Sequence, residues 1–254
     1  MSFFLSSDII VEEWQGWSGF VTQSCTSTMD LAWKLCEVEQ LAEWGWIRTQ
    51  HQTQGRGQFG RRWLSDEGNL MVSLRLPDSA GNMGSSLSLV LAICLVRALE
   101  SLGVSALIKW PNDIMSGFEK LGGILIEQRK ERTVAGIGLN IISAPKSSFD
   151  EEFFHIQATC LKKININIDP LGLWVLFLDS IRNNLFDMMK HPENTAKAVE
   201  NFLAFKGDIV VLKNTGICDG PARIIGIDSQ GSLRVQTSEG EFFINSGQIN
   251  LRVI

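Results

Sequence analysis

The sequence has no surplus of basic residues, and this weighs against one broad class of function. Its 254 residues include 23 Lys and Arg against 28 Asp and Glu, a formal net charge of −5. Proteins that coat nucleic acid are usually basic, so the bulk charge argues against that role, although a local basic loop stays compatible with it. Hydrophobic residues make up 44% and charged residues 20%. This is an ordinary globular composition, enough for one large domain or for one large and one small domain.

Cysteines are few, and they do not form a recognisable framework. Their number is odd, their spacing is wide, and no C-x-x-C pair occurs. This pattern is typical of reduced thiols in a cytosolic protein and argues against a disulfide framework or a zinc site. The five cysteines are Cys25, Cys36, Cys94, Cys160 and Cys218.

The sequence also lacks a membrane or export signal. Its longest apolar run, 87-LSLVLAICLVRAL-99, is interrupted by Arg97 and is too short to span a bilayer. The N-terminus has an apolar patch but no basic start, so it does not resemble a secretory signal. We therefore predict a cytoplasmic protein with no membrane partner. No internal repeat or low-complexity segment is present.

Hydrophobic periodicity predicts an α+β fold: a mixed β-sheet backed by helices, followed by a small all-β module. Residues 206–254 change to short alternating strands between glycine turns, and we place the domains at 1–203 and 204–254. Residues 114–120 are predicted as a loop, and residues 149–165 fit no single element. The predicted helices are 26–45, 85–102, 171–189 and 193–205. The predicted strands are 46–52, 71–76, 104–110, 121–128 and 133–142.

The stretch 55-GRGQFGRRW-63 contains G-x-G-x-x-G, the dinucleotide-binding fingerprint. That fingerprint requires a helix after the loop, but a strand is predicted here, so the match is read as coincidental. The glycines and arginines could instead present N–H groups to an anion, with Trp63 as a flat face for a base. The alternative is a solvated hairpin loop with surface arginines.

Three further motifs could carry chemistry. In 109-KWPND-113 and 120-KLGG-123, Asp113 and Lys120 could meet at the rim of the sheet, where a lysine can neutralise a carboxylate that attacks a phosphate. The alternative is an ordinary hairpin with a polar turn. The glycines of 136-GIGLN-140 allow a ligand to approach closely, or simply allow tight packing. The hydroxyls of 27-STMD-30 stand at a helix start, where they could also be plain caps.

Taken together and in this order, these motifs resemble the biotin protein ligase family. The family pattern is a Ser-Thr helix start, then Q-x-x-G-R-G-x-x-G-R-x-W, K-W-P-N-D, K-[LI]-[AG]-G-[IV]-L-x-E and G-x-G-x-N. The similarity is strong over residues 20–145. It returns weakly at 205-FKGDIVVL-212 and 247-GQINLR-252, which resemble the family's small C-terminal all-β barrel. The matching segments are Ser27-Thr28, 52-QTQGRGQFGRRW-63, 109-KWPND-113, 120-KLGGILIE-127 and 136-GIGLN-140.

The resemblance implies a set of site residues. Lys120 and Asp113 would be the catalytic pair, with Arg56 assisting them as the glycine loop closes. The biotin-binding set would be Ser27, Thr28, Met29, Gln52, Arg56, Gly57, Gln58 and Lys120. The nucleotide-binding set would be Arg61, Trp63, Lys109, Asn112, Asn140 and Arg252. No protein-held metal site is implied.

The resemblance also implies the reaction. Biotin and ATP, with Mg²⁺, would form biotinyl-5′-AMP, and biotin would then pass to a lysine of the biotin carboxyl carrier protein of a carboxylase. A helix-turn-helix has no room before Ser27, so no DNA partner is expected. The sequence does not fix the oligomeric state, and a homodimer is left open.

The sequence departs from the family pattern at two positions. Gln58 stands where arginine is common, so we predict that biotinyl-AMP is released more readily than in an arginine-bearing relative. Met29 stands where many members have asparagine, which puts that contact in doubt. The competing interpretations are a lipoate or octanoate ligase, a non-catalytic biotin-binding homologue, and a nucleic-acid regulator that uses the basic loop.

Overall fold

The computed structural model describes residues 9–64, 66–145 and 156–250, and the chain divides into two compact units. The first unit comprises residues 1–82, 123–145 and 160–175, and the second comprises residues 83–122, 146–159 and 176–254. Strand β7 (Glu119–Arg129) begins in the second unit and continues into the first, and helix α3 (Pro170–Lys190) does the reverse.

The first unit is built on a mixed sheet, as the sequence predicts. The strand order is β1-β2-β3-β4-β8-β7. Strand β3 pairs in parallel with β2 and antiparallel with β4, which in turn pairs antiparallel with β8. Besides β7, the strands are β1 (Ile10–Trp14), β2 (Trp17–Cys25), β3 (Trp46–Gln52), β4 (Leu70–Leu76) and β8 (Arg132–Leu139).

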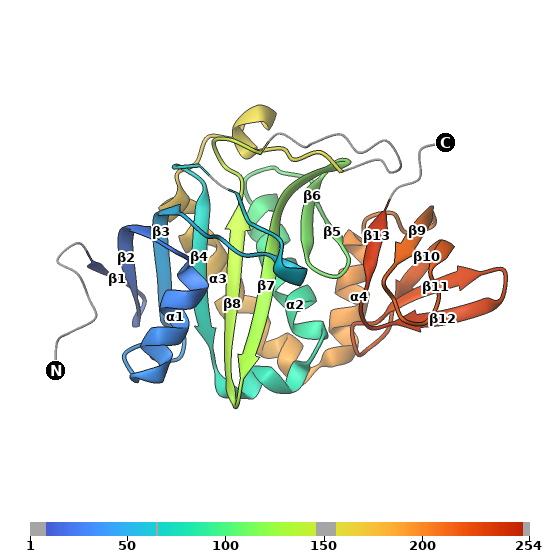
Figure 1. The fold of residues 1–254 in the computed structure, drawn as a ribbon, viewed down its shortest axis with the longest axis horizontal. Helices are drawn as coiled ribbons and strands as arrows, with labels where there is room; N and C mark the ends of the chain where they lie inside the picture. Colours follow the sequence, from blue (N-terminus) through green and yellow to red (C-terminus); the bar gives the residue numbers. More distant parts are fainter. Residues whose placement is uncertain (1–8, 65, 146–155, 251–254) are drawn as a thin grey trace. The chain divides into compact units, whose positions relative to one another are not determined.

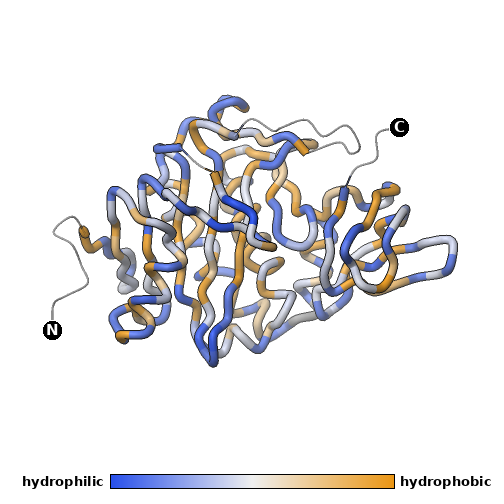
Figure 2. Tube along the Cα trace, viewed as in Figure 1, coloured by the Kyte–Doolittle hydropathy of each residue, from blue (hydrophilic) through white to orange (hydrophobic). Residues whose placement is uncertain are grey.

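Strand β3 shows how both faces of this sheet are covered. Successive side chains of a strand point to opposite faces. Ile47 joins the buried cluster of helix α1 (Thr28–Glu37), which lies in front of β3 and β4 in Figure 1. Trp46 instead meets Trp174 of α3 edge to face, with ring centroids 5.9 Å apart. Figure 2 shows hydrophobic residues recurring along β4 and β7, whereas the turn between β7 and β8 is hydrophilic.

The second unit contains the strongly apolar helix that the sequence predicts at 85–102. This helix, α2 (Ser86–Glu100), contacts β5 (Ala106–Lys109), β6 (Asp113–Ser116) and α4 (Pro192–Phe202). Strands β5 and β6 form an antiparallel hairpin, and the strand order here is β7-β6-β5. Short 3₁₀ helices occur in the chain at η1 (Gln58–Gly60), η2 (Asp78–Met83) and η3 (Leu161–Ile164).

The C-terminal residues of the second unit form a separate antiparallel sheet, which confirms the predicted all-β module. Its strand order is β12-β11-β10-β9-β13. Within the described residues β12 and β13 are the end strands of this order, and no pairing between them closes the sheet into the barrel that the resemblance implies. The strands are β9 (Ile209–Lys213), β10 (Gly220–Ile227), β11 (Leu233–Thr237), β12 (Gly240–Ile244) and β13 (Gln248–Asn250).

A turn of this C-terminal sheet contacts the K-W-P-N-D segment inside the second unit. The indole of Trp110 is 1% exposed, and its Nε1 donates to the carbonyl oxygen of Gly231 at 3.0 Å. Ser85 donates its hydroxyl to the carbonyl of the neighbouring Gln230 at 2.9 Å. A Cβ on Gly231 would lie 2.8 Å from the Cα of Ser86, so the backbones meet closely there. The domain boundary at 203/204 stays a prediction.

Two predictions about the bounds of elements are wrong, and one hairpin was missed. The first helix ends at Glu37 rather than Gly45, because Glu39 and Trp44 take positive φ angles that a helix excludes. Residues 114–120 are not a loop, since β6 and the start of β7 occupy most of them. The β1–β2 hairpin was not predicted at all. It stands at the end of the sheet order, where Trp17 stacks on Trp44 with ring centroids 4.6 Å apart.

Candidate functional site

The glycine loop is a tight hairpin between β3 and β4, so the dinucleotide context is absent, as predicted. Its strands are joined by hydrogen bonds from Gly57 N to Arg61 O at 2.7 Å and from Trp63 N to Gly55 O at 2.9 Å. The turn passes through Phe59 and Gly60, with φ angles of 56° and 72°. The segment crosses in front of β8 and β7 in Figure 1. We refer to residues 55–63 as the glycine hairpin.

Gly55 and Gly57 of the hairpin differ in how much space a side chain would have. A Cβ on Gly55 would lie 2.6 Å from the carbonyl oxygen of Trp63, so only glycine fits there. A Cβ on Gly57 would meet nothing closer than the carbonyl oxygen of Arg61 at 3.6 Å, an ordinary contact. Folding of the hairpin therefore explains Gly55 but not Gly57.

Trp63 anchors the far end of the hairpin on β8. A Cβ on Gly138 would lie 2.4–2.7 Å from three atoms of the Trp63 ring, so the indole rests directly on this glycine. Gly136 leaves room in the same way for the buried side chain of Met29, whose Sδ would be 3.0 Å from a Cβ there. Both glycines of the G-x-G-x-N strand thus serve side-chain packing. Asn140, directly after β8, is 2% exposed.

The start of α1 holds an unsatisfied hydroxyl. The predicted side-chain cap is wrong: Ser27 occupies the N-cap position without a capping hydrogen bond. Instead, Oε1 of Gln52 accepts from Thr28 N at 2.8 Å and from Thr28 Oγ1 at 3.1 Å. Ser73 donates its hydroxyl to Thr28 Oγ1 at 2.8 Å. Ser27 is 1% exposed, and its Oγ has no hydrogen-bond partner among the residues that the structure describes.

A buried hydroxyl without a partner costs free energy, about 1–3 kcal/mol, and is rare in native proteins. Ser27 is therefore a natural place for a polar ligand group. Gln52 supports this interpretation, because it takes over the capping of α1 from Ser27 and so frees the serine.

A cluster of opposite charges lies on the β5–β6 hairpin and the start of β7, within the second unit. Lys109 and Asp113 face each other across the hairpin. The Asp113 carboxylate accepts from Lys109 Nζ at 3.2 Å and from Lys120 Nζ at 2.5 Å. The side chains of Lys109, Asp113 and Lys120 are 12%, 16% and 32% exposed. The predicted meeting of Asp113 and Lys120 is therefore present, and Lys109 completes it.

The charge state of Asp113 follows from these contacts. Burial raises the pKa of its carboxyl, but the ammonium groups of Lys109 and Lys120 and their hydrogen bonds outweigh burial, so the pKa lies below its ordinary value. Asp113 is thus held ionised and orients the two lysines. Their excess positive charge is available to an anion.

The main chain of Lys120 is also fixed. Its N–H donates to the carbonyl of Gln157 at 2.7 Å, and its carbonyl accepts from Thr159 N at 2.9 Å. Lys120 therefore stands on a strand that is paired at this point rather than on a free loop.

The remaining predicted residues lie as follows. Arg61 is exposed on the glycine hairpin, Gln58 begins its turn, and Asn112 follows Pro111 in the β5–β6 connection. Arg252 lies outside the described residues. Sequence reasoning included Asp30 in the motif 27-STMD-30 without a role, and its carboxylate Oδ1 lies 2.9 Å from Nη2 of Arg56. It included Glu127 in a motif without a role, and Glu127 Oε1 lies 3.1 Å from the same nitrogen.

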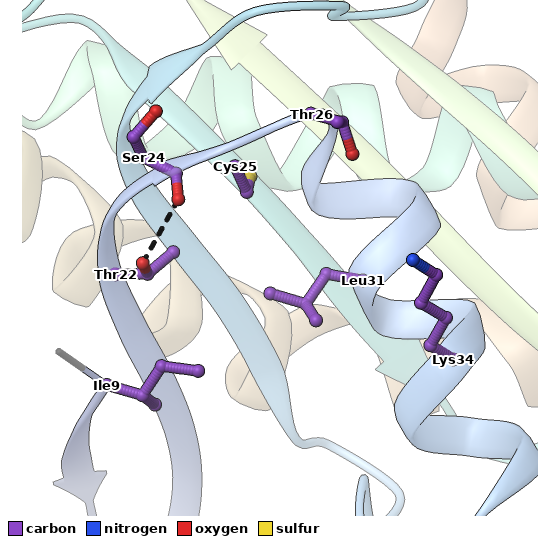
Figure 3. A pocket seen from close by; sticks show the side chains of 7 residues that line it. All are labelled: Ile9, Thr22, Ser24, Cys25, Thr26, Leu31 and Lys34. Atoms are coloured by element: carbon purple, nitrogen blue, oxygen red, sulfur yellow. Dashed lines mark hydrogen bonds between the residues drawn. The ribbon is translucent and has the colours of Figure 1, made fainter. Parts of the chain in front are cut away.

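A hollow of about 220 Å³ opens between α1 and β2, and none of its lining residues belongs to the predicted site set. Figure 3 shows Leu31 of α1 pointing toward Thr22 of β2, and Lys34 running along the helix toward Thr26. Thr22 Oγ1 donates to the Ser24 carbonyl at 3.2 Å. Burial raises the pKa of the Cys25 thiol to about 11, so it is not a nucleophile at neutral pH.

The part of the chain that is described also bears on disulfides, metal sites and membrane spans. The five cysteines are free there. No three His, Cys, Asp or Glu side chains of the described ranges gather as a metal site. No helix in the same ranges is long and apolar enough to cross a bilayer.

Comparison with known proteins covers the part of the chain that holds these motifs. Residues 21–141 match the model of the "Biotin/lipoate A/B protein ligase family". The chain is 32% identical over 210 residues to the bifunctional ligase/repressor BirA of Bacillus subtilis, covering 79% of this chain and 64% of that protein. It is 36% identical over 109 residues to a biotin–[acetyl-CoA-carboxylase] ligase of Paracoccus denitrificans, covering 39% of this chain and 45% of that protein.

Among solved structures, the fold resembles the biotin protein ligase of Aquifex aeolicus in complex with biotin and ATP. The TM-score is 0.78 at 27% identity, with 92% of this chain and 99% of that chain covered. The chain spans about two thirds of the length of the Bacillus subtilis relative, 64%.

Proposed function

We propose that this chain, whose residues 21–141 match the biotin/lipoate A/B protein ligase family, is a biotin protein ligase. It activates biotin with ATP to biotinyl-5′-AMP. It then transfers the biotinyl group to a lysine of the biotin carboxyl carrier protein of a carboxylase. The proposal divides the chain into a catalytic part at 1–203 and a C-terminal module at 204–254.

The observation that carries the proposal is the ionised Asp113 held between Lys109 and Lys120. A biotin carboxylate and the α-phosphate of ATP are both anions and repel each other unless cations are fixed beside them. A pre-oriented ammonium stabilises the charge that develops during the transfer without reorganising at that moment. We assign this role to Lys120, with Lys109 beside it and Asp113 as the residue that orients both.

Biotin is assigned to the start of α1. Its ureido ring carries two N–H donors and a carbonyl acceptor, which suit a pair of hydroxyls and a carboxamide. The unpartnered hydroxyl of Ser27 is the first contact, and Thr28 and Gln52 follow. Met29 is buried at 3% exposure and offers only an apolar surface here, in place of the polar contact of many relatives.

The glycine hairpin is assigned to the adenylate. Trp63 offers its indole face to adenine, and Asn112, Asn140 and Arg61 serve the nucleotide with Arg252. Gly57, which has no steric reason to be glycine in the free protein, would let the hairpin backbone approach the ligand, with Arg56 and Gln58 on either side. A closed hairpin keeps water from the mixed anhydride until the acceptor arrives.

Bonds and charges balance over two steps. The biotin carboxylate oxygen attacks the α-phosphorus, and pyrophosphate leaves. The unprotonated amine of the acceptor lysine then attacks the acyl carbon, the acyl–phosphate bond breaks, and AMP leaves. ATP arrives as its Mg²⁺ complex. Both oxygens of Asp113 are engaged by lysines, so this carboxylate does not suit a resident ion.

The net charge and the cysteines bear on the partners and the cellular compartment of this protein. With a net charge of −5 we propose no DNA partner for this chain. The five free cysteines suit a reducing compartment, which we take to be the cytoplasm.

The test is ATP–pyrophosphate exchange on the purified protein, with biotin in one reaction and lipoate in a parallel one. Lys120→Ala should reduce biotin-dependent exchange by about 10²–10³-fold, the usual loss for one pre-oriented charge or donor. Lys206→Ala is the matched control, because Lys206 is also ion-paired in the second unit, to Glu200 at 2.8 Å. Exchange with lipoate alone, or full activity in Lys120→Ala, would refute the assignment.

A further inference from the structure

Arg56 is held by two carboxylates from different elements, and the proposed reaction does not require this arrangement. Its Nη2 lies 2.9 Å from Asp30 Oδ1 on α1 and 3.1 Å from Glu127 Oε1 on β7. The Arg56, Asp30 and Glu127 side chains are 37%, 37% and 22% exposed. We propose that Asp30 and Glu127 are positioning residues that clamp Arg56 and so keep the glycine hairpin closed before any ligand binds.

Glu127 is suited to this role because it is itself tied to the core. Its Oε2 accepts from the indole Nε1 of Trp33 at 2.8 Å, and Trp33 is 3% exposed. Arg129 approaches the same oxygen at 3.4 Å and covers the Trp33 ring with its guanidinium 4.5 Å from the centroid. Glu127 is therefore a fixed point and not a mobile surface carboxylate.

The two carboxylates of the clamp are matched by two guanidinium groups. Asp30 and Glu127 face Arg56 and Arg129, while the exposed Glu37 lies at the edge of the group, 4.0 Å from Arg129. Both ion pairs use Nη2 of Arg56. The clamp therefore does not require the other two guanidinium nitrogens, which can donate to a carboxylate or phosphate without breaking it.

The clamp completes the attachment of the glycine hairpin. Trp63 anchors one strand of the hairpin on Gly138, and Arg56 anchors the other strand on α1 and β7. A hairpin that is already closed loses less conformational entropy when a ligand binds. The clamp therefore acts on binding and on retention of the adenylate, and not on the chemical step. This consequence rests on the proposed function, whereas the closed state of the free protein does not.

The experiment measures trypsin cleavage after Arg56, Arg61 and Arg62 in the ligand-free protein, followed by mass spectrometry. The variants are Asp30→Asn, Glu127→Gln and the double variant. Glu37→Gln is the matched control, since Glu37 on α1 is 68% exposed and 4.0 Å from Arg129. Each partly exposed ion pair changes the equilibrium between closed and open hairpin by a few-fold. The rate of cleavage follows the population of the open hairpin. We expect about 3-fold faster cleavage per single variant and about 10-fold for the double.

A kinetic measurement separates a positioning role from a merely structural one. The single variants should raise KM for biotin about 3-fold and leave kcat unchanged, because the clamp favours the closed hairpin and not the transfer. Cleavage and KM equal to those of the parent and of Glu37→Gln would overturn the proposal. If the parent shows no exchange with biotin while the variants still accelerate cleavage, the clamp stands and the proposed function fails.

Discussion

Replacing Gly138 with alanine should displace the Trp63 ring from β8. The variant therefore tests how much this one contact of the glycine hairpin contributes. The new Cβ would lie 2.4 Å from the indole, against 3.4 Å for an ordinary contact, so the ring must retreat by about 1 Å. Gly136→Ala is the matched control on the same strand. There the Cβ meets the flexible end of Met29 at 3.0 Å, so a shift of a few tenths of an ångström suffices.

The expected loss of stability depends on how easily the neighbouring side chain, Trp63 or Met29, can move. Forcing an extra methyl against a packed side chain costs about 1–3 kcal/mol. At the middle of that range, about 2 kcal/mol, and at roughly 2–4 °C per kcal/mol for a chain of this size, Gly138→Ala should lower Tm by about 4–8 °C. Methionine adapts its shape, so Gly136→Ala should stay within about 2 °C of the parent.

The assay is thermal unfolding of both variants, followed by KM for ATP and for biotin in the exchange reaction. In Gly138→Ala, KM for ATP should rise more than KM for biotin, because Trp63 is assigned to adenine. If both variants unfold at the same temperature, or if only KM for biotin changes, the placement of Trp63 on Gly138 does not have the consequence we derive from it.

Two further predictions concern single side chains. Gln58→Arg should slow the release of biotinyl-AMP from the enzyme, since a cation is restored beside the phosphate; unchanged release in a filter assay would contradict this. Asp113→Asn should lower the free energy of unfolding by about 3 kcal/mol at pH 7, because one partner of a largely buried charge cluster is lost. The lowered pKa of Asp113 means that its contribution is complete above about pH 4 and disappears as the pH falls through that pKa. Urea unfolding should therefore show a smaller difference in the free energy of unfolding between parent and variant at pH 3 than at pH 7.

The sequence predicted the elements whose patterns are local. Strand β3 was predicted at 46–52 as observed, and α2 was predicted within two residues at each end, because a long apolar helix that ends before Gly103 leaves little choice. The β1–β2 hairpin escaped prediction because Ile10 and Val11 are 66% and 58% exposed, so β1 has no buried alternation to recognise.

The part of the site that was predicted consists of residues that lie close together in the sequence. Motif spacing identified Lys120 and Asp113, which are close in the chain and meet across a hairpin. The clamp on Arg56 could not be predicted, because α1 and β7 are far apart in the sequence and ion pairs between them leave no local pattern. The same holds for Gln52, whose role at the start of α1 depends on the register of two parallel strands.

The link between Trp110 and the C-terminal sheet bears on how the sequence can change in evolution. The indole bonds to a main-chain oxygen, which every amino acid supplies, so side chains of the sheet can be exchanged without losing it. Gly231 is the exception. Its φ is +83°, which favours glycine, and a Cβ there would clash with the Ser86 backbone. Both the backbone conformation and the lack of space therefore exclude a side chain. In distant orthologues we therefore expect this glycine to persist at the turn while the surrounding residues drift.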